Sequence, residues 1–199
     1  VFLMLCMTVN GQITYGLKAG INYSTIGGGS AKEADEVNAL IGPHGGAFAQ
    51  YKFRDNIAVQ GELLGSYQGA NAKVSRMVGT TMVDVDQNFK LAYILLPVMV
   101  QFYPMPNLRL EWGPQIGYNM TKDILITANV RLEGDLQRYE QRMDDLHKWD
   151  FALNAGMGYE FTESWAAVFR YSHGFTSLDK TGEYDFQNRV ISLSAEYRF

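Results

Sequence analysis

Residues 149–161 read WDFALNAGMGYEF. Every second residue from Trp149 to Phe161 is apolar or aromatic, whereas the residues between them include Asp150, Asn154 and Glu160. A period of two residues is that of a β-strand whose two faces lie in different surroundings. The stretch is also longer than the roughly 9–11 residues that a tilted strand needs to cross a membrane. It therefore predicts a strand that could span a bilayer.

The same alternation recurs along the chain and predicts eight strands, near residues 12–23, 41–53, 57–68, 89–103, 108–119, 149–161, 165–172 and 189–199. Short turns follow the second, fourth and sixth strands, at 54–56, 104–107 and 162–164. Longer connections follow the other strands, near 24–40, 69–88, 122–148 and 175–188. Within the third of them, the stretch from Ile124 to Val130 alternates, which could prolong strands above the membrane. This asymmetry is typical of outer-membrane barrels, with short periplasmic turns and longer outside loops. We predict an all-β fold, an eight-stranded antiparallel up-and-down transmembrane β-barrel with both termini periplasmic.

The two faces of the predicted strands decide between a membrane barrel and a soluble one. One face carries most charged residues and many glycines, and the other is almost continuously apolar and aromatic. A soluble eight-stranded barrel would have to enclose too many aromatic rings in a narrow cavity. An inside-out barrel places the rings in lipid and the charges and glycines inside. The residues 89–103 are apolar on both faces, so the orientation of that strand stays open. We expect a short-turn aromatic girdle made of Tyr15, Tyr51, Phe53, Tyr103, Phe161, Trp165, Tyr197 and Phe199.

Composition agrees with a β-barrel. Charged residues make up 19% of the 199 residues and aromatic residues 13%, which excludes a disordered chain. The net charge of −4 gives no reason to expect nucleic-acid binding. No apolar run approaches the roughly 20 residues of a membrane helix.

The first nine residues read VFLMLCMTV, an uncharged apolar run that fits the core of a secretory signal. Val9 and Gly11 suit the −3 and −1 positions of a cleavage site. We expect residues 1–11 to be a truncated signal peptide that is removed, and residues 12–199 to be the barrel domain. Cys6 is the one cysteine in the chain, so a mature chain starting at Gln12 would hold no disulfide.

Several segments together resemble a known family. FKLAYILLPVMVQFY at 89–103, NLRLEWGPQIGYNM at 107–120, WDFALNAGMGYEF at 149–161, FRYSHGFTSL at 169–178 and the terminal AEYRF resemble successive strands of the PorT-like outer-membrane barrel family of Bacteroidetes. The resemblance implies an outer-membrane barrel, and it does not identify a role in type IX secretion. One departure is Leu95, where the family often has an acidic residue two before the proline of this strand.

Six inward charges form the main candidate site, a lumen ion-pair network of Lys18, Glu62, Arg109, Glu111, Arg170 and Glu196. Charges inside a narrow lumen must be paired or hydrated, because burying an isolated charge is costly. Arg170 and Glu62 share face and depth, so we expect Arg170 to pair with Glu62 or with another inward carboxylate. At the chain end, Tyr197 and Phe199 resemble the terminal aromatic signal that the barrel-assembly machinery recognises.

Catalytic and metal candidates are weak. Ser172 and His173 are neighbours on one strand and point to opposite faces, so they cannot form a nucleophile–base pair with each other. His44 has no partner at ligand spacing in the sequence, and His147 lies in a loop beside Asp144 and Asp145. The triplet Gly27–Gly28–Gly29 lacks the Lys-Ser/Thr of a phosphate loop. We expect no catalytic residue, no metal and no cofactor.

The sequence thus predicts a small non-enzymatic outer-membrane barrel with a structural or accessory role, within a larger envelope complex. Its partners are expected to be outer-membrane lipid, the barrel-assembly machinery and an envelope protein bound through the loops near 24–40 and 122–148, but not nucleic acid. A narrow channel is one alternative. A lipid-modifying enzyme is the second, and it would need Ser, His and acid groups to converge from different strands.

Overall fold

The structure is a computed structural model that describes residues 12–27, 36–78, 81–121, 124–132, 135–143, 147–177 and 187–199. The predicted signal residues 1–11 therefore lie outside the described residues. All strands belong to one antiparallel sheet. No helix among the described residues is long and apolar enough to cross a membrane.

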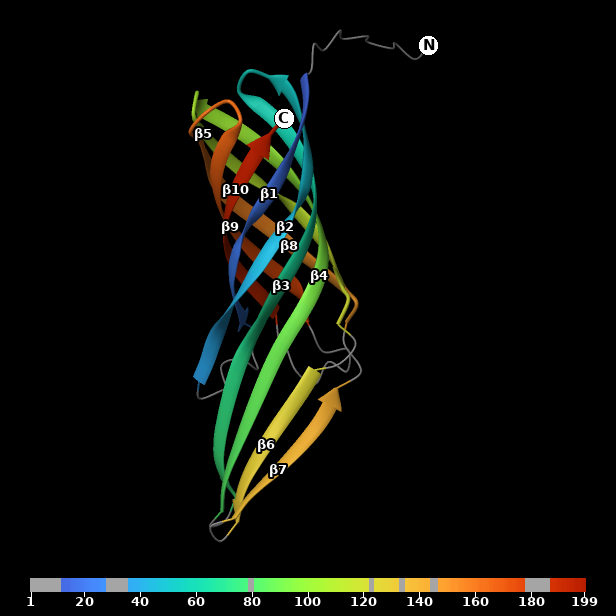
Figure 1. The fold of residues 1–199 in the computed structure, drawn as a ribbon, viewed down its shortest axis with the longest axis vertical. Helices are drawn as coiled ribbons and strands as arrows, with labels where there is room; N and C mark the ends of the chain where they lie inside the picture. Colours follow the sequence, from blue (N-terminus) through green and yellow to red (C-terminus); the bar gives the residue numbers. More distant parts are fainter. Residues whose placement is uncertain are drawn as a thin grey trace.

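Eight strands close into a barrel, as the alternation predicts (Figure 1). They are β1 (Gln12–Gly27), β2 (Glu36–Arg54), β3 (Ile57–Val78), β4 (Thr81–Met105), β5 (Leu108–Asn119), β8 (Trp149–Glu160), β9 (Trp165–Ser177) and β10 (Gln187–Arg198). Each strand pairs with the next one of this series, and β10 pairs with β1 from Gly16↔Arg198 to Gly27↔Gln187. Closure leaves no unpaired edge around the barrel wall, which lipid requires.

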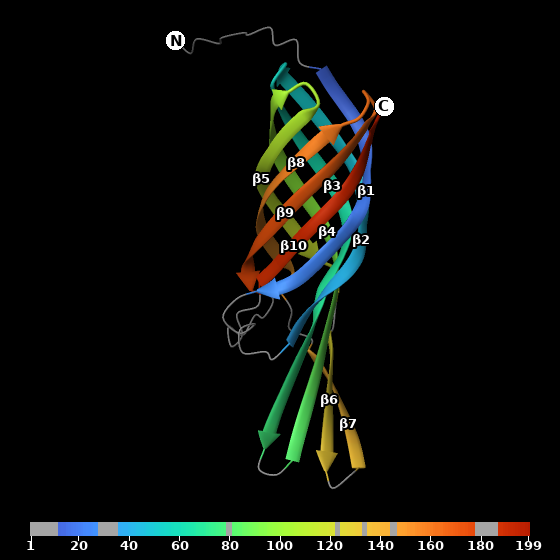
Figure 2. The same cartoon turned by 90° about the vertical axis from the view of Figure 1, so that its left-hand side faces the viewer.

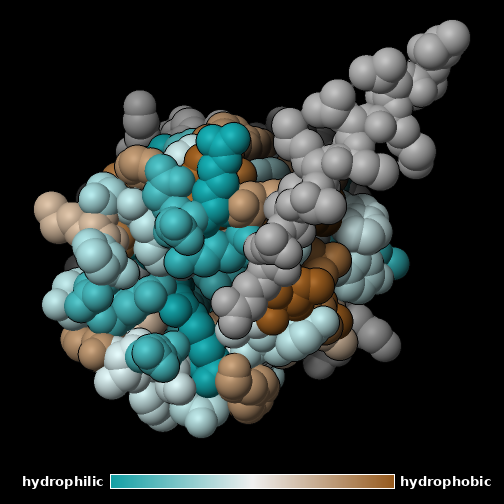
Figure 3. All heavy atoms as spheres, turned by 90° about the horizontal axis from the view of Figure 1, so that it is seen from above, coloured by the Kyte–Doolittle hydropathy of each residue, from teal (hydrophilic) through white to brown (hydrophobic). Residues whose placement is uncertain are grey.

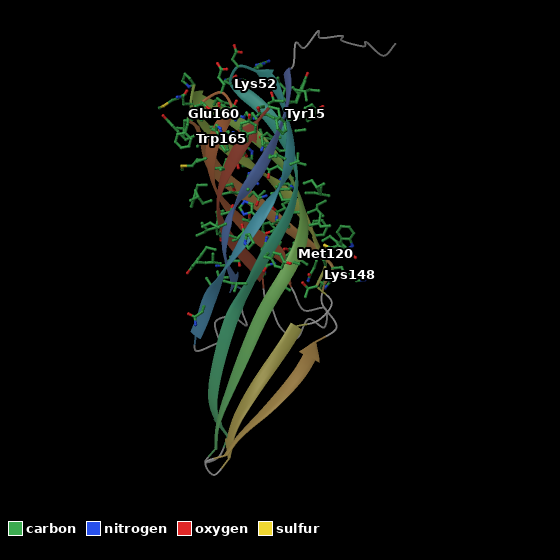
Figure 4. All side chains as sticks on the ribbon, in the orientation of Figure 1. Tyr15, Lys52, Met120, Lys148, Glu160 and Trp165 are labelled. Carbon is green, nitrogen blue, oxygen red and sulfur yellow. The ribbon has the colours of Figure 1, made fainter. Side chains whose placement is uncertain are left out.

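The short turns lie together at one end of the barrel. They connect β2 to β3, β4 to β5, and β8 to β9. The C-terminus lies at this end (Figure 2), where the backbone N–H of Phe199 donates to the carbonyl of Tyr15 at 3.0 Å. In Figure 4, Lys52, Glu160 and Trp165 mark this short-turn end, and Met120 and Lys148 mark the opposite, long-connection end.

The long-connection end differs from the sequence-based expectation. The predicted loop at 69–88 is wrong, because β3 continues to Val78 and β4 begins at Thr81. The loop predicted at 24–40 is shorter, since β1 ends at Gly27 and β2 begins at Glu36. The segment at 122–148 holds two further strands, β6 (Ile124–Leu132) and β7 (Asp135–Met143). Ladder pairing thus continues beyond the barrel. The alternation from Ile124 to Val130 indicated this for β6, whereas the polar composition of 69–88 had indicated a loop.

These segments form a four-stranded extension, made of residues 70–78 of β3, 81–89 of β4, β6 and β7 (Figure 1). Strand β6 pairs with β4 from Met82↔Arg131 to Asn88↔Leu125. At the base of the extension, Gly69 has a φ of 155°, which residues with a Cβ rarely adopt. Its backbone N–H donates to the Ser24 hydroxyl at 2.8 Å. A glycine therefore marks the point where β3 leaves the barrel.

Candidate functional site

The lumen is built from the inward faces of the barrel strands, most of which are polar. Alternate residues of β5 are buried from Arg109 to Asn119, and those of β10 from Asn188 to Glu196. The inward residues of the ambiguous strand β4 are Leu91, Tyr93, Leu95, Pro97, Met99, Gln101 and Tyr103. Its orientation, which the sequence left open, is thereby set by the register with β3 and β5.

The structure brings the six predicted lumen charges together. Lys18 on β1 lies between two carboxylates, with its Nζ 3.1 Å from Glu62 on β3 and 3.2 Å from Glu196 on β10. All three side chains are at most 2% exposed. Their burial means that each charge depends on its partners rather than on bulk water.

Arg170 on β9 lies at the centre of the network. Its guanidinium donates two hydrogen bonds of 2.8 Å to the two carboxylate oxygens of Glu62. It also donates from Nε and Nη2 to one oxygen of Glu111, at 2.8 and 2.6 Å. A planar guanidinium can serve two carboxylates in this way, whereas a lysine ammonium lacks the fork geometry.

Arg109 on β5 extends the network toward the short-turn end. Its guanidinium forms a short ion pair with Glu196, and it lies 3.5 Å from carboxylate oxygens of Glu111 and Glu160. Glu160 in turn accepts a 2.5 Å hydrogen bond from Arg198. Each named cation is therefore matched by a carboxylate, which makes the network close to neutral.

A layer of glutamine side chains and one tyrosine hydroxyl fills the lumen beside the charges, and together they form what we call the plug. The sequence analysis did not identify this layer as part of the site. Gln60 donates to Glu62 at 2.8 Å, and Gln101 donates to Gln60 at 3.1 Å and to Glu111 at 3.3 Å. Gln50 donates to Gln101 at 2.6 Å. The inward parity of these glutamines was the available signal, but their lack of charge gave no reason to single them out.

Tyr103 is a correction to the predicted aromatic girdle. Its side chain is buried in the lumen, where its hydroxyl accepts a hydrogen bond from Gln50 at 3.1 Å and donates to Gln101 at 3.4 Å. The ammonium of Lys52 lies 5.0 Å from its ring centroid. Its position at a strand end suggested the girdle, but the register of β4 turns it inward.

Glycines on the inward face make room for these large side chains. A Cβ at Gly158 would collide with the Arg109 side chain, and a Cβ at Gly16 would collide with the Phe48 ring. Each of these glycines is directly paired with the large residue on the neighbouring strand, Gly16 with Phe48 and Gly158 with Arg109, so the missing Cβ leaves room for that side chain. An interior of eight strands is just wide enough for side chains to fill it.

The long-connection half of the lumen is polar but mostly uncharged. Asn22 donates to Ser66 at 2.7 Å, and Asn188 donates to the Tyr93 hydroxyl at 3.1 Å and to Asp150 at 3.3 Å. A cavity of about 20 Å³ lies beside Lys18, His44 and Arg170, with room for about one water molecule. Leu95 is buried beside this cavity. It stands at the position where the family that the sequence resembles often has an acidic residue.

Two of the three histidines have hydrogen-bonding neighbours in the structure, and Asp144 and Asp145 beside His147 lie outside the described residues. His44 Nε2 lies 2.8 Å from the Ser194 hydroxyl, and His173 Nδ1 lies 3.3 Å from the Tyr171 hydroxyl on the outer side. Ser172 turns inward and donates to Asn154. Among the described residues, no cluster of three or more His, Cys, Asp and Glu side chains could hold a metal ion.

The outer face of the barrel is covered by exposed apolar and aromatic side chains. Examples at mid-barrel are Leu17, Leu63, Trp112, Met157 and Leu193, all at least 49% exposed. Aromatic pairs lie at both ends, with Trp165 against Tyr197 near the short turns and Tyr118 against Trp149 near the long connections. Figure 3, seen from the short-turn end, shows hydrophilic residues gathered across this end with hydrophobic patches at its rim. An apolar belt of this extent is suited to lipid.

A family model described as "Outer membrane protein beta-barrel domain" matches residues 9–180. The chain belongs to this outer-membrane β-barrel family. Membership and the closed eight-stranded fold place the protein in the bacterial outer membrane. The narrower PorT-like resemblance is not tested by the family match.

Solved structures of small outer-membrane barrels are similar to this family member. Neisserial surface protein A shares 13% sequence identity over 94% of this chain and 99% of its own, with a TM-score of 0.53. Ail of Yersinia pestis shares 16% identity over 94% and 99%, with a TM-score of 0.45. At these identities the likeness concerns the fold alone. No curated protein matches the sequence.

Proposed function

We propose that this protein is a closed, non-enzymatic outer-membrane barrel with a structural or accessory binding role, within a larger envelope complex. The observation that carries the proposal is the plugged lumen. Lys18, Arg109 and Arg170 are each bonded to buried carboxylates, and the glutamine layer fills the space beside them. Removing one partner of a buried ion pair leaves an uncompensated charge and strongly destabilises the protein. The paired side chains are therefore expected to stay together and keep the lumen filled.

A closed lumen should carry no ions. Purified, folded protein in a planar bilayer is expected to leave the membrane conductance at the protein-free baseline. Heat-modifiable migration of the same sample on gels shows that the folded barrel is present. Discrete current steps whose frequency rises with the amount of protein would instead favour the alternative of a narrow channel.

A lipid-modifying enzyme is the second candidate, because His44 and Ser194 do converge from β2 and β10. Three features weigh against catalysis. Both side chains are at least 92% buried within the lumen. His44 Nδ1 has no hydrogen-bond partner among the described residues, so no acid orients the imidazole as in a catalytic triad. The adjacent cavity has room for about one water and not for an acyl chain.

We also propose that the short turns and both termini are periplasmic and that the long connections and the four-stranded extension lie outside the cell. Single-cysteine variants in a Cys6→Ser background test this orientation. Lys180→Cys, in the segment near 175–188, should react with a membrane-impermeant maleimide on intact cells. Asp55→Cys and Glu163→Cys, in short turns, should react only after lysis. Labelling of either turn on intact cells would mean that the short turns lie outside the cell, which contradicts the proposed orientation.

The proposed partners follow from these surfaces. Outer-membrane lipid would cover the apolar belt, and the barrel-assembly machinery would recognise Tyr197 and Phe199 during biogenesis. An envelope protein would bind through the segments near 24–40 and 122–148, and the net charge of −4 gives no support for nucleic acid. The strand motifs keep membership of the PorT-like group of Bacteroidetes as a narrower proposal. A mild-detergent pull-down from native membranes should recover a stable partner, and recovery of the barrel alone would argue against the accessory role.

A further inference from the structure

Arg189 is a cation on the outward wall of the barrel that has no carboxylate beside it. It lies on β10 and is directly paired with His173 on β9 and Thr25 on β1, three strands that run side by side (Figure 2). The other arginines of β5, β9 and β10 each form an ion pair with a carboxylate, and they are Arg109, Arg170 and Arg198. Arg189 forms no ion pair with the described residues, and its Nε is buried without a hydrogen-bond partner. Its charge is thus left for a partner that the described chain does not supply.

Arg189 stands at the border of the apolar belt. The row of directly paired residues on its short-turn side is apolar or aromatic throughout, and its members, each at least 38% exposed, are Tyr171, Ile191, Tyr23 and Ile41. The row of His173, Arg189 and Thr25 is the first polar row toward the long-connection end. From Tyr197 to Arg189, β10 runs for about 27 Å, which is about 20 Å of membrane depth at a tilt of roughly 40°. The apolar band of such barrels is about 25 Å tall, so Arg189 lies close to the level of the lipid headgroups.

The guanidinium points away from the middle of the belt. A Cβ at Gly27 would collide with Nε and Cζ of Arg189. Gly27 lies two residues beyond Thr25, which is the direct partner of Arg189, toward the long-connection end. The side chain of Arg189 therefore extends along the wall in that direction, as arginines near a membrane boundary do to keep their charge out of hydrocarbon. The missing Cβ of Gly27 leaves the slot in which the guanidinium lies.

His173 adds an imidazole to the same row. Its Nδ1 lies 3.3 Å from the Tyr171 hydroxyl, and its ring packs edge to face against Phe175, with 5.2 Å between the ring centroids. These contacts hold the imidazole in the row of Arg189, and Nε2 is the ring nitrogen that would meet a ligand. A guanidinium and an imidazole side by side can donate to several oxygens of one phosphate group.

We propose that Arg189 and His173 bind the phosphate of an anionic lipid whose acyl chains lie on the adjacent apolar row of β9, β10 and β1. This inference rests on the proposal that lipid covers the apolar belt, and it adds one headgroup chemistry at one place. In the proposed orientation the lipid belongs to the outer leaflet. A free phosphate would meet the same nitrogens but would not use the exposed apolar row beside them, which favours a lipid.

Native mass spectrometry of the folded barrel in mild detergent tests the site. Phosphatidylglycerol is the anionic probe, and phosphatidylcholine with the same acyl chains is the neutral one. The wild type should bind phosphatidylglycerol at least about tenfold more tightly, because the choline cation competes with Arg189 for the phosphate. Arg189→Gln should reduce this preference to less than about threefold. Lys148→Gln removes the same charge from an exposed residue at the same end (Figure 4) and should leave the preference within about twofold of wild type.

Two further variants separate a positioned site from a general attraction of charge. Gly27→Ala keeps every charge but fills the slot of the guanidinium, and it should weaken phosphatidylglycerol binding at least about threefold. His173→Phe keeps an aromatic ring beside Phe175 and should weaken this binding by a similar factor, because Nε2 is lost. Heat-modifiable migration confirms that each variant is folded.

Three results would contradict the proposal in different ways. Equal affinity of the wild type for the two lipids, or an unchanged preference in folded Arg189→Gln, would overturn the site. Loss of phosphatidylglycerol binding in millimolar inorganic phosphate would assign the site to free phosphate and overturn the lipid as ligand. Failure of the wild type to fold into phosphatidylcholine vesicles would instead refute the lipid-covered belt itself.

Discussion

Replacing Arg170 with methionine is expected to lower the free energy of unfolding of the barrel by about 3–5 kcal/mol. The guanidinium bonds to both Glu62 and Glu111, whose side chains have no solvent exposure. Methionine fills much of the same space but leaves two buried carboxylates with fewer donors. Denaturant unfolding in lipid vesicles, followed by tryptophan fluorescence, measures the loss.

Arg170→Lys is the matched control for charge. It keeps the positive charge but cannot offer paired N–H groups to two carboxylates. The decrease in the free energy of unfolding caused by Arg170→Lys should lie between zero and the decrease caused by Arg170→Met. If Arg170→Met and wild type unfold at the same denaturant concentration, Arg170 does not stabilise the lumen and the plug is not held as described.

Deleting Phe199 is expected to reduce the amount of folded barrel in the outer membrane more than about tenfold, as loss of an aromatic recognition residue worth at least ~2 kcal/mol would do. The folded barrel itself should lose little. The Phe199 side chain is 76% exposed, its ring contacts Tyr197 edge to face, and its backbone contributes one hydrogen bond to Tyr15. Assembly and stability should therefore separate. Heat-modifiable migration of membrane fractions measures the folded amount.

A deletion within residues 175–188 is the control, because it also shortens the chain near its end but leaves Tyr197 and Phe199 intact. It should assemble far better than the Phe199 deletion. Equal amounts of folded barrel from the wild type and the Phe199 deletion would refute an assembly signal at this residue, without affecting the barrel assignment.

The barrel itself was predictable because alternation is a local property. Trp112 and Glu111, for example, are neighbours on one strand, and the apolar ring faces lipid whereas the carboxylate faces the lumen. Such a pair of residues indicates the orientation of its strand. The inward direction of the six lumen charges was also predictable, because they lie on the polar faces of their strands and at similar depth along the barrel. The strand at 89–103 was predictable but its orientation was not, because the inward Leu95 and the outward Leu96 of β4 are equally apolar. There, only pairing with β3 and β5 sets the faces.

The remaining differences have the same origin. Tyr103 suits either an interface girdle or a buried hydrogen-bonded position, and only the register distinguishes them. The extension was predicted only in part. The alternation from Ile124 to Val130 indicated a strand above the membrane, as β6 shows, whereas Val83 and Val85 alternate with Asp84 and Asp86 within a segment that was interpreted as a loop. The strands of the extension become evident as a sheet only when the pairing of β4 with β6 is known. The local alternation of a segment thus gives no information about which distant strand it pairs with.

A double-mutant cycle between Arg170 and Glu62 tests the central claim most directly, which is that the inward charges close the lumen as one bonded network. The variants are Arg170→Met, Glu62→Gln and their combination, compared by unfolding in lipid vesicles. The side chains share two hydrogen bonds of 2.8 Å in a buried setting. We predict a coupling free energy of about 2–3 kcal/mol, with the double variant less destabilised than the sum of the single ones. Additive effects, within about 0.5 kcal/mol, would contradict the network.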